Sequence, residues 1–298
     1  MLKSEHRTKA LGKRIGEEME GWTVERVLRQ NLGVSRGLLR RAKGSGSILL
    51  NGQLVKTNQR VAVGEMLEVY FEEEKHSIIP QRMPLDIRYE DEGLLIVNKP
   101  AGILVHPLTN EPTGTLANGV VHYFQEQGEN IRFRPVHRLD RGTSGLVLVA
   151  KSSYIHHQLA KRLTANLFTR RYIALVHGQM KEDRGTIREP IGLVDGSFIK
   201  RIVTSQGKEA VSRYQVLRSF KKWSLVAVEL ETGRTHQVRV HLAHLGNPLL
   251  GDNLYGGDNN FIARPALHCG FLAFTHPHSN QVIKVACPIP KDMRKLLG

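Results

Sequence analysis

The chain has 298 residues, enough for one large domain or two of ordinary size, and its 40% of apolar residues is typical of globular proteins. It holds 43 Lys and Arg against 28 Asp and Glu, which gives a formal net charge of +15. No apolar run reaches the ~18–20 residues of a membrane span, and two cysteines without a Cys-x-x-Cys pattern predict neither a disulfide scaffold nor a zinc ribbon. We therefore expect a polyanionic partner, nucleic acid above all, and a cytoplasmic protein without membrane attachment.

Residues 15–75 are predicted to form a small α+β module. Helices are expected at 23–32 and 36–42, with Ser35 as the N-cap of the second. A strand at 48–50, the turn Asn51-Gly52 and further strand through 63 and at 67–71 predict a hairpin-rich sheet. Four basic side chains on and just beyond the second helix are candidate phosphate contacts: Arg36, Arg40, Arg41 and Lys43. The alternative is that they only cover a solvated helix face.

A charged run at 72–75, followed by prolines at 80 and 84, predicts a linker over 76–84. In the remainder, 85–298, strand and helix signals alternate irregularly. Strands are expected at 94–98, 145–150, 171–176, 209–218, 224–231 and 282–286, and helices at 116–125, 154–163, 236–244 and 291–297. Two of these strands are separated only by a short turn, which favours antiparallel hairpins over βαβ units, so we predict an α+β fold.

The segment 135–146 contains a candidate catalytic carboxylate. Asp140 lies between Arg138 and Arg141 and precedes a Thr-Ser-Gly turn and an apolar strand. Neighbouring cations favour the ionised form of such a carboxylate. The same pattern also fits a turn aspartate that is satisfied by its arginines and by backbone amides, because structural ion pairs resemble active sites in this respect.

Two further segments are rich in functional side chains. Residues 233–244 hold two arginines and three histidines at a predicted helix start, and His241 and His244 share a face. No Asp, Glu or Cys accompanies them, so we interpret this segment as a basic surface for phosphate and not as a metal site. Tyr172 follows two arginines in a predicted strand, where it either belongs to the core or faces RNA.

The segment 137–146 resembles the signature of the RluA/RluD-type family of pseudouridine synthases. Further blocks of the family pattern follow in the expected order at 94–102, 105–107, 170–175, 233–241, 246–248 and 251–252, and the end blocks at 267–269 and 274–277 fit as well. The resemblance covers 85–298 continuously. Residues 15–75 resemble the S4-like RNA-binding domain that often precedes this catalytic domain, although 42–47 depart from its usual helix-to-strand transition.

The resemblance implies a mostly antiparallel, bent central sheet flanked by helices, and it implies roles for four residues. Asp140 corresponds to the catalytic aspartate, and Arg234 to the arginine that pairs with it. Tyr172 corresponds to the aromatic residue that stacks on the target base, and Arg138 to the arginine that enters the RNA beside the flipped nucleotide. Arg141 is a further candidate RNA contact.

The implied reaction exchanges no electrons and loses no group, so we expect neither a metal nor another cofactor. A free Asp, with a pKa of ~3.9, is ionised at neutral pH. Such a carboxylate can attack the base, attack the sugar or remove a ribose proton, and the sequence leaves these routes open. The S4-like module favours large-subunit ribosomal RNA over transfer RNA, and we expect a monomer. The rival interpretations are a non-catalytic RNA-binding or ribosome-assembly factor and an RNA-hydrolysing enzyme.

Overall fold

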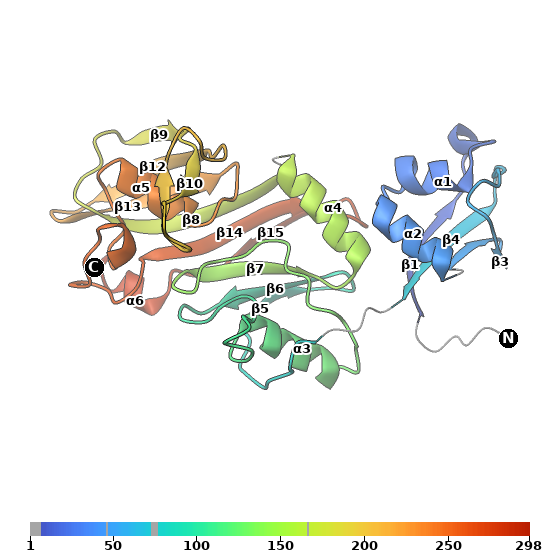
Figure 1. Cartoon of the computed structure of the whole chain (residues 1–298), viewed down its shortest axis with the longest axis horizontal. Helices are drawn as coiled ribbons and strands as arrows, with labels where there is room; N and C mark the ends of the chain where they lie inside the picture. Colours follow the sequence, from blue (N-terminus) through green and yellow to red (C-terminus); the bar gives the residue numbers. More distant parts are fainter. Residues whose placement is uncertain (1–6, 46, 73–76, 166) are drawn as a thin grey trace.

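The computed structural model describes residues 7–45, 47–72, 77–165 and 167–298. The N-terminal part forms a four-stranded sheet in the order β1-β4-β2-β3 (Figure 1). Its strands are β1 (Arg7–Arg14), β2 (Ile48–Leu50), β3 (Gln53–Leu54) and β4 (Met66–Glu72), and its helical segments are η1 (Glu17–Met19), α1 (Val24–Arg26), η2 (Val27–Asn31) and α2 (Arg36–Gly44). The strand β1 was not predicted. The expected end of the module at 75 lies outside the described residues.

Local sequence patterns, such as helix caps and turn residues, determine most of the secondary structure of this module. The Ser35 side chain accepts the Leu38 amide at 3.1 Å, so the predicted N-cap of α2 is confirmed. Asn51 and Gly52 have φ values of 51° and 78°, as a tight hairpin turn between β2 and β3 requires. The further strand expected from this turn through 63 is present only as β3, because the chain turns again at 57–58 and at 63–64. Residues 77–86, which include most of the expected linker, form neither helix nor strand.

The rest of the chain is organised around a nine-stranded sheet in the order β5-β6-β7-β14-β8-β13-β12-β9, with β15 paired to β14. Every pairing in it is antiparallel except that of β7 with β14, which bears out the α+β prediction. The strands are β5 (Ile87–Glu90), β6 (Leu94–Lys99), β7 (Ser144–Ala150), β8 (Phe168–His177), β9 (Arg184–Ile187), β12 (Ser212–Ser219), β13 (Trp223–Leu230), β14 (Leu267–Thr275) and β15 (Val282–Ala286). A separate hairpin joins β10 (Ile191–Leu193) to β11 (Arg201–Val203).

Helices cover this sheet at several places (Figure 1). They are α3 (Leu116–Glu126), α4 (Ser153–Thr164), α5 (Gln237–His244), η3 (Asn253–Tyr255) and α6 (Lys291–Arg294). The four helices predicted in this part of the chain are all present, although α6 is shorter than expected. No described helix is long and apolar enough to cross a membrane.

The buried centre of the sheet explains the apolar runs in the sequence. Every residue of β7 is buried, so both faces of this strand are covered. Gly145 lies where β7 meets β14 in parallel, and a Cβ atom there would come within 2.3 Å of the Cys269 carbonyl oxygen. Its φ of 118° is also one that L side chains rarely adopt. A glycine is therefore required five residues after Asp140.

The N-terminal module contacts the part of the chain that holds the nine-stranded sheet through α4 (Figure 1). The Tyr154 hydroxyl donates to the Leu32 carbonyl at 2.8 Å, and the Gln158 amide donates to the carbonyls of Leu32 and Gly33 at 3.1 Å each. These contacts fasten the loop between η2 and α2 to one helix of the larger sheet.

Candidate active site

Asp140 lies in a turn directly before β7, the most buried strand of the sheet. The amide of Thr143 donates to the Asp140 carbonyl at 3.1 Å and closes this turn. The Asp140 side chain is 28% exposed, and its Oδ2 atom faces Arg239 Nη1 at 3.4 Å and His236 Nε2 at 3.9 Å. Among the described side-chain contacts, Oδ1 has no partner. One carboxylate oxygen is thus held by the protein, and the other is left for a substrate.

Arg239 is the cation that pairs with Asp140. Its guanidinium grips Asp252 with two hydrogen bonds, Nε to Oδ2 at 2.7 Å and Nη2 to Oδ1 at 2.8 Å, and this leaves Nη1 for Asp140. Asp252 is 1% exposed and Arg239 is 8% exposed, so the pair is shielded from water. A planar guanidinium fixed at two points gives its third contact a defined direction.

The expected pairing of Arg234 with Asp140 is not what the structure shows. Arg234 lies before α5, and its Nε donates to the Glu209 carbonyl at 2.8 Å. Its backbone amide donates to the Gln237 side chain at 2.9 Å. Because α5 begins at Gln237, Arg239 lies on the first turn that faces Asp140, whereas Arg234 is directed to the segment that precedes β12.

His236 reaches Asp140 from a strained backbone position. It is the N-cap of α5 with φ 58° and ψ 18°, a left-handed conformation that is uncommon for a residue other than glycine. Its Nδ1 lies 2.8 Å from the Tyr255 hydroxyl, whose oxygen also accepts the Arg201 amide at 3.0 Å. Burial lowers the pKa of His236, and the Asp140 charge opposes this effect. When the Tyr255 hydroxyl donates to Nδ1, the proton of the neutral ring lies on Nε2, which faces Asp140.

Tyr172 lies near the middle of β8, opposite Cys269 of β14, and is 5% exposed. Burial is the main cause that raises the pKa of its phenol, and the Asp140 charge adds to the effect. Cys269 pairs on its other side with Gly145 of β7, so Tyr172 lies one strand away from the strand that follows the Asp140 turn. Burial also raises the pKa of the Cys269 thiol to about 12, so this cysteine is a neutral neighbour and not a nucleophile.

Lys99, which the sequence analysis did not select, supports the Asp140 turn from the core. It is fully buried, and its ammonium donates to the carbonyls of Pro100 at 2.8 Å, Ile103 at 2.9 Å and Arg141 at 3.3 Å. Burial lowers the pKa of Lys99 to about 7, and the Asp140 charge counteracts this. The hydrogen bond to the Arg141 carbonyl ties the residue after Asp140 to the end of β6.

The remaining predicted residues lie outside this constellation. Arg138 is exposed and has no ion pair in the described chain, and Arg141 forms an exposed ion pair with Glu111 at 2.5 Å. On the exposed face of α2 lie Arg36, Arg40, Arg41 and Lys43. Figure 1 places α2 at the opposite end of the molecule from α5, so the structure does not bring these side chains to Asp140.

Both ring nitrogens of His241 have partners within the protein. Its two ring nitrogens lie 2.8 Å from the Ser212 hydroxyl and 2.9 Å from the Glu189 carbonyl. His244 is exposed at the end of α5. Within the described ranges, no group of three or more His, Cys, Asp or Glu side chains is arranged to hold a metal ion.

The sequence partly indicated Arg239 and Asp252, two residues of the site that the sequence analysis did not select. Arg239 shares the segment 233–241 with Arg234, and Asp252 belongs to the family block 251–252. A buried arginine needs a carboxylate partner. A search for an acid to match each arginine of the segment would have drawn attention to Asp252, but not to Tyr255.

We predict that His236→Asn folds normally, because asparagine tolerates the left-handed conformation, and that it slows the chemistry at Asp140. The loss should be about tenfold or more, since groups that position or transfer protons commonly contribute 10²–10⁴-fold. Single-turnover rates at saturating RNA measure it. His244→Asn, on the exposed end of the same helix, is the matched control and should react as the wild type does.

Comparison with known proteins adds a family to this geometry. The family model described as RNA pseudouridylate synthase matches residues 93–244. The chain is 42% identical over 269 residues to "Uncharacterized RNA pseudouridine synthase YjbO" of Bacillus subtilis, covering 89% of this chain and 95% of that protein. It is 38% identical over 266 residues to "Ribosomal large subunit pseudouridine synthase D" of Escherichia coli K12, covering 84% and 81%. Among solved structures, "Human RNA Pseudouridylate Synthase Domain Containing 1" matches with a TM-score of 0.57 at 28% identity, covering 72% of this chain and 86% of that one.

Proposed function

This chain belongs to the RNA pseudouridylate synthase family, and from that membership we propose that Asp140 is its catalytic carboxylate and that its substrate is a uridine in ribosomal RNA. The family activity makes it an isomerase that acts on RNA. One observation supports the site assignment above others. A carboxylate 28% exposed is held through one oxygen by Arg239, which is itself fixed by the buried Asp252.

The reaction needs a carboxylate with a defined direction. The N1–C1′ bond of the uridine breaks, the uracil turns, and C5 bonds to C1′, while C5 loses one proton and N1 gains one. The unpartnered Oδ1 of Asp140 is available to attack the base or the sugar, or to remove a ribose proton. Arg239 and His236 hold Oδ2, so that Oδ1 is presented without reorganisation during the reaction.

The target nucleotide must leave its stack to reach Asp140, which costs a few kcal/mol. We assign Tyr172 as the surface against which the uracil ring packs, because it lies across β14 from Gly145, five residues after Asp140. Stacking of a base on an aromatic ring is worth about 1–3 kcal/mol. We propose that Arg138, which is exposed and lies two residues before Asp140, takes the space that the nucleotide vacates.

Nucleoside analysis of treated RNA tests this function. Ribosomal RNA from cells that lack the protein is incubated with purified enzyme in EDTA, and then analysed for pseudouridine and for strand breaks. We expect new pseudouridine at discrete positions and intact strands. Strand breaks would favour a hydrolase, and tight binding without any new pseudouridine would favour a non-catalytic RNA-binding factor.

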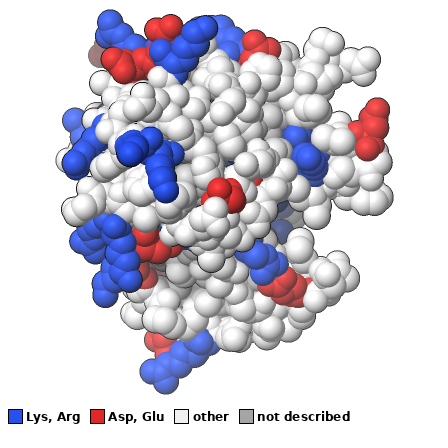
Figure 2. Space-filling model, turned by 90° about the vertical axis from the view of Figure 1, so that its left-hand side faces the viewer, with Lys and Arg blue, Asp and Glu red and all other residues white. Residues whose placement is uncertain are grey.

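The charge of the molecule and its N-terminal module support the choice of a large structured RNA. The basic excess is spread over the folded surface, and Figure 2 shows Lys and Arg side chains in several separate patches on one end of the molecule. We propose that residues 15–75 form an S4-like RNA-binding domain, that 76–84 are a linker, and that 85–298 form the catalytic domain. We further propose that the protein acts as a monomer in the cytoplasm.

The module should set RNA affinity without entering the chemical step. We predict that Arg36→Glu combined with Arg40→Glu weakens RNA binding and makes log affinity less dependent on log salt, since each phosphate contact contributes about 0.7–0.9 to that slope. The single-turnover rate at saturating RNA should stay within about twofold of wild type.

Filter binding at several salt concentrations measures the effect of the α2 variant. Lys284→Glu, on the exposed face of β15, is the control for a reversed charge elsewhere. An unchanged salt slope in the double variant would mean that these arginines only cover a solvated helix.

A further inference from the structure

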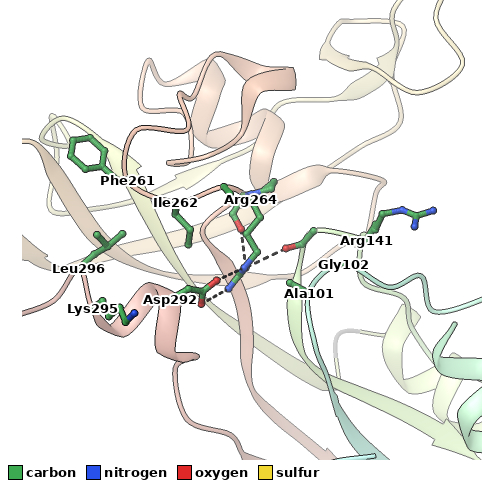
Figure 3. Close-up of a pocket in the computed structure, with 12 residues that line it drawn as sticks. Ala101, Gly102, Arg141, Phe261, Ile262, Arg264, Asp292, Lys295 and Leu296 are labelled. Carbon is green, nitrogen blue, oxygen red and sulfur yellow. Dashed lines mark hydrogen bonds and ion pairs between the residues drawn. The ribbon is translucent and has the colours of Figure 1, made fainter. Parts of the chain in front are cut away.

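A pocket of about 800 Å³ begins at Arg141, the residue that follows Asp140 in the same turn (Figure 3). One wall consists of Ala101, Gly102, Arg141 and Gly142, and the other consists of residues 261–265 and the C-terminal residues Asp292, Lys295 and Leu296. The volume lies within the roughly 300–1,000 Å³ of typical ligand sites. Nothing in the proposed chemistry of Asp140 uses this space.

The walls of the pocket are fixed to each other by Arg264. Its guanidinium grips Asp292 with Nε to Oδ2 at 2.7 Å and Nη2 to Oδ1 at 3.0 Å. Its Nη1 donates to the carbonyl of Gly142 at 3.2 Å, and also to those of Pro265 and Leu267. Arg264 therefore joins Gly142, two residues after Asp140, to α6. Its N–H groups donate to other groups of the protein and are not left for a ligand. The pocket is built before any ligand arrives.

The lining combines an apolar interior with a cationic rim. Phe261, Ile262 and Leu296 supply apolar surface. Lys295 is exposed, and within the described residues its ammonium has no partner, while Arg141 is exposed and pairs only with Glu111. Asp292, the one acid of the lining, is neutralised by Arg264. This combination suits a flat, weakly polar ring attached to an anion.

A nucleotide of RNA has that chemistry, since its base packs on apolar surface and its phosphate pairs with Lys or Arg. The pocket wall begins one residue after Asp140, so a nucleotide adjacent to the reacting uridine lies within reach. The covalent link to that uridine would also raise its effective concentration at the pocket. A free small molecule would lack this advantage.

We propose that this pocket binds a nucleotide of the substrate strand next to the target uridine, with its base between residues 261–262 and Leu296 and its phosphate at Lys295. The inference rests on the proposed action on RNA and extends it to substrate selection. The pocket selects which uridines are positioned at Asp140, and it takes no part in making or breaking bonds.

The test uses full-length protein and a transcript spanning a uridine that the wild type converts. Ala263 lines the pocket and is exposed, so Ala263→Trp fills the space without entering the core, and Ala263→Ser is the matched control at the same position. Lys295→Glu reverses the rim charge, with Lys284→Glu as its control.

A second set of transcripts carries an abasic site at each position flanking the uridine. Thermal melts verify folding.

Ala263→Trp and Lys295→Glu should each weaken binding of the intact transcript about tenfold, in line with the loss of one stacked base. An abasic site at one flanking position should weaken wild-type binding similarly, and Ala263→Trp should then cause no further loss. Wild-type affinity in both variants would overturn the proposal, as would losses that simply add to that of the abasic site. Either result leaves the proposed function standing, because wild-type pseudouridine formation tests it separately.

Discussion

Replacing Asp140 by asparagine is expected to abolish pseudouridine formation while the fold and RNA binding are retained. Asparagine keeps the size and polarity of the side chain but removes the charge that serves as nucleophile or base. The position is 28% exposed, and its carbonyl, which closes the turn with Thr143, is unaffected by the change. We expect the single-turnover rate to fall by a factor of about 10³ or more, with RNA affinity within a few-fold of wild type.

Nucleoside analysis after single-turnover incubation measures this loss. Asp258→Asn is a matched control, because Asp258 is a partly exposed aspartate outside the site, and its rate should equal the wild-type rate. If Asp140→Asn retained a tenth of the wild-type rate, the carboxylate could not be the catalytic group, even though the family assignment would stand.

The second large effect is expected at Arg239. Lysine variants of Arg239 and of Arg234 distinguish the roles of the two arginines. Arg239→Lys keeps the charge but loses the planar fork that grips Asp252 and faces Asp140. We expect its single-turnover rate to fall about 10²-fold, the scale seen when one oriented electrostatic contact is lost. Arg234→Lys should stay within about twofold, because that side chain makes its bond to the Glu209 carbonyl, in the segment before β12.

A purely structural role of Arg239 has a different signature. The single-turnover rate at saturating RNA, the dissociation constant and the melting temperature are measured together for both variants. A positioning role requires that the Arg239→Lys rate falls while RNA affinity is kept, and that the rate does not recover at lower temperature, where the fold is intact. Equal rates for the two lysine variants would remove Arg239 from the site. A slower Arg234→Lys than Arg239→Lys would restore the pairing that the sequence predicted.

The features that the sequence determined are those encoded within a few neighbouring residues. The N-cap at Ser35 needs one hydroxyl before a helical segment, and the turn at Asn51-Gly52 needs two residues that accept positive φ. The apolar runs that became β6 and β7 are contiguous, so their burial could be predicted from hydrophobicity alone. The motif around Asp140 is equally local, and it gave the family and the candidate carboxylate.

Tertiary structure decided the features that depend on distant partners. The central strand β14 was not predicted, because its His268, Cys269 and Gly270 break the apolar pattern, and its place beside β7 depends on the absent side chain of Gly145. Arg234 and Arg239 both lie near the start of α5, and both are of the residue type that the family pattern requires to pair with the catalytic aspartate. Only the packing of α5 shows that Arg239 is the one that faces Asp140.

The physical reason is the separation along the chain of the groups that meet. Asp140 and Arg239 are 99 residues apart, and the buried Asp252 that orients Arg239 is 13 residues beyond it. A local pattern specifies which side chains are available and which backbone conformations they prefer. It does not specify how strands that are far apart in the sequence pair with each other. That pairing is what brings Arg239, His236 and Asp140 together.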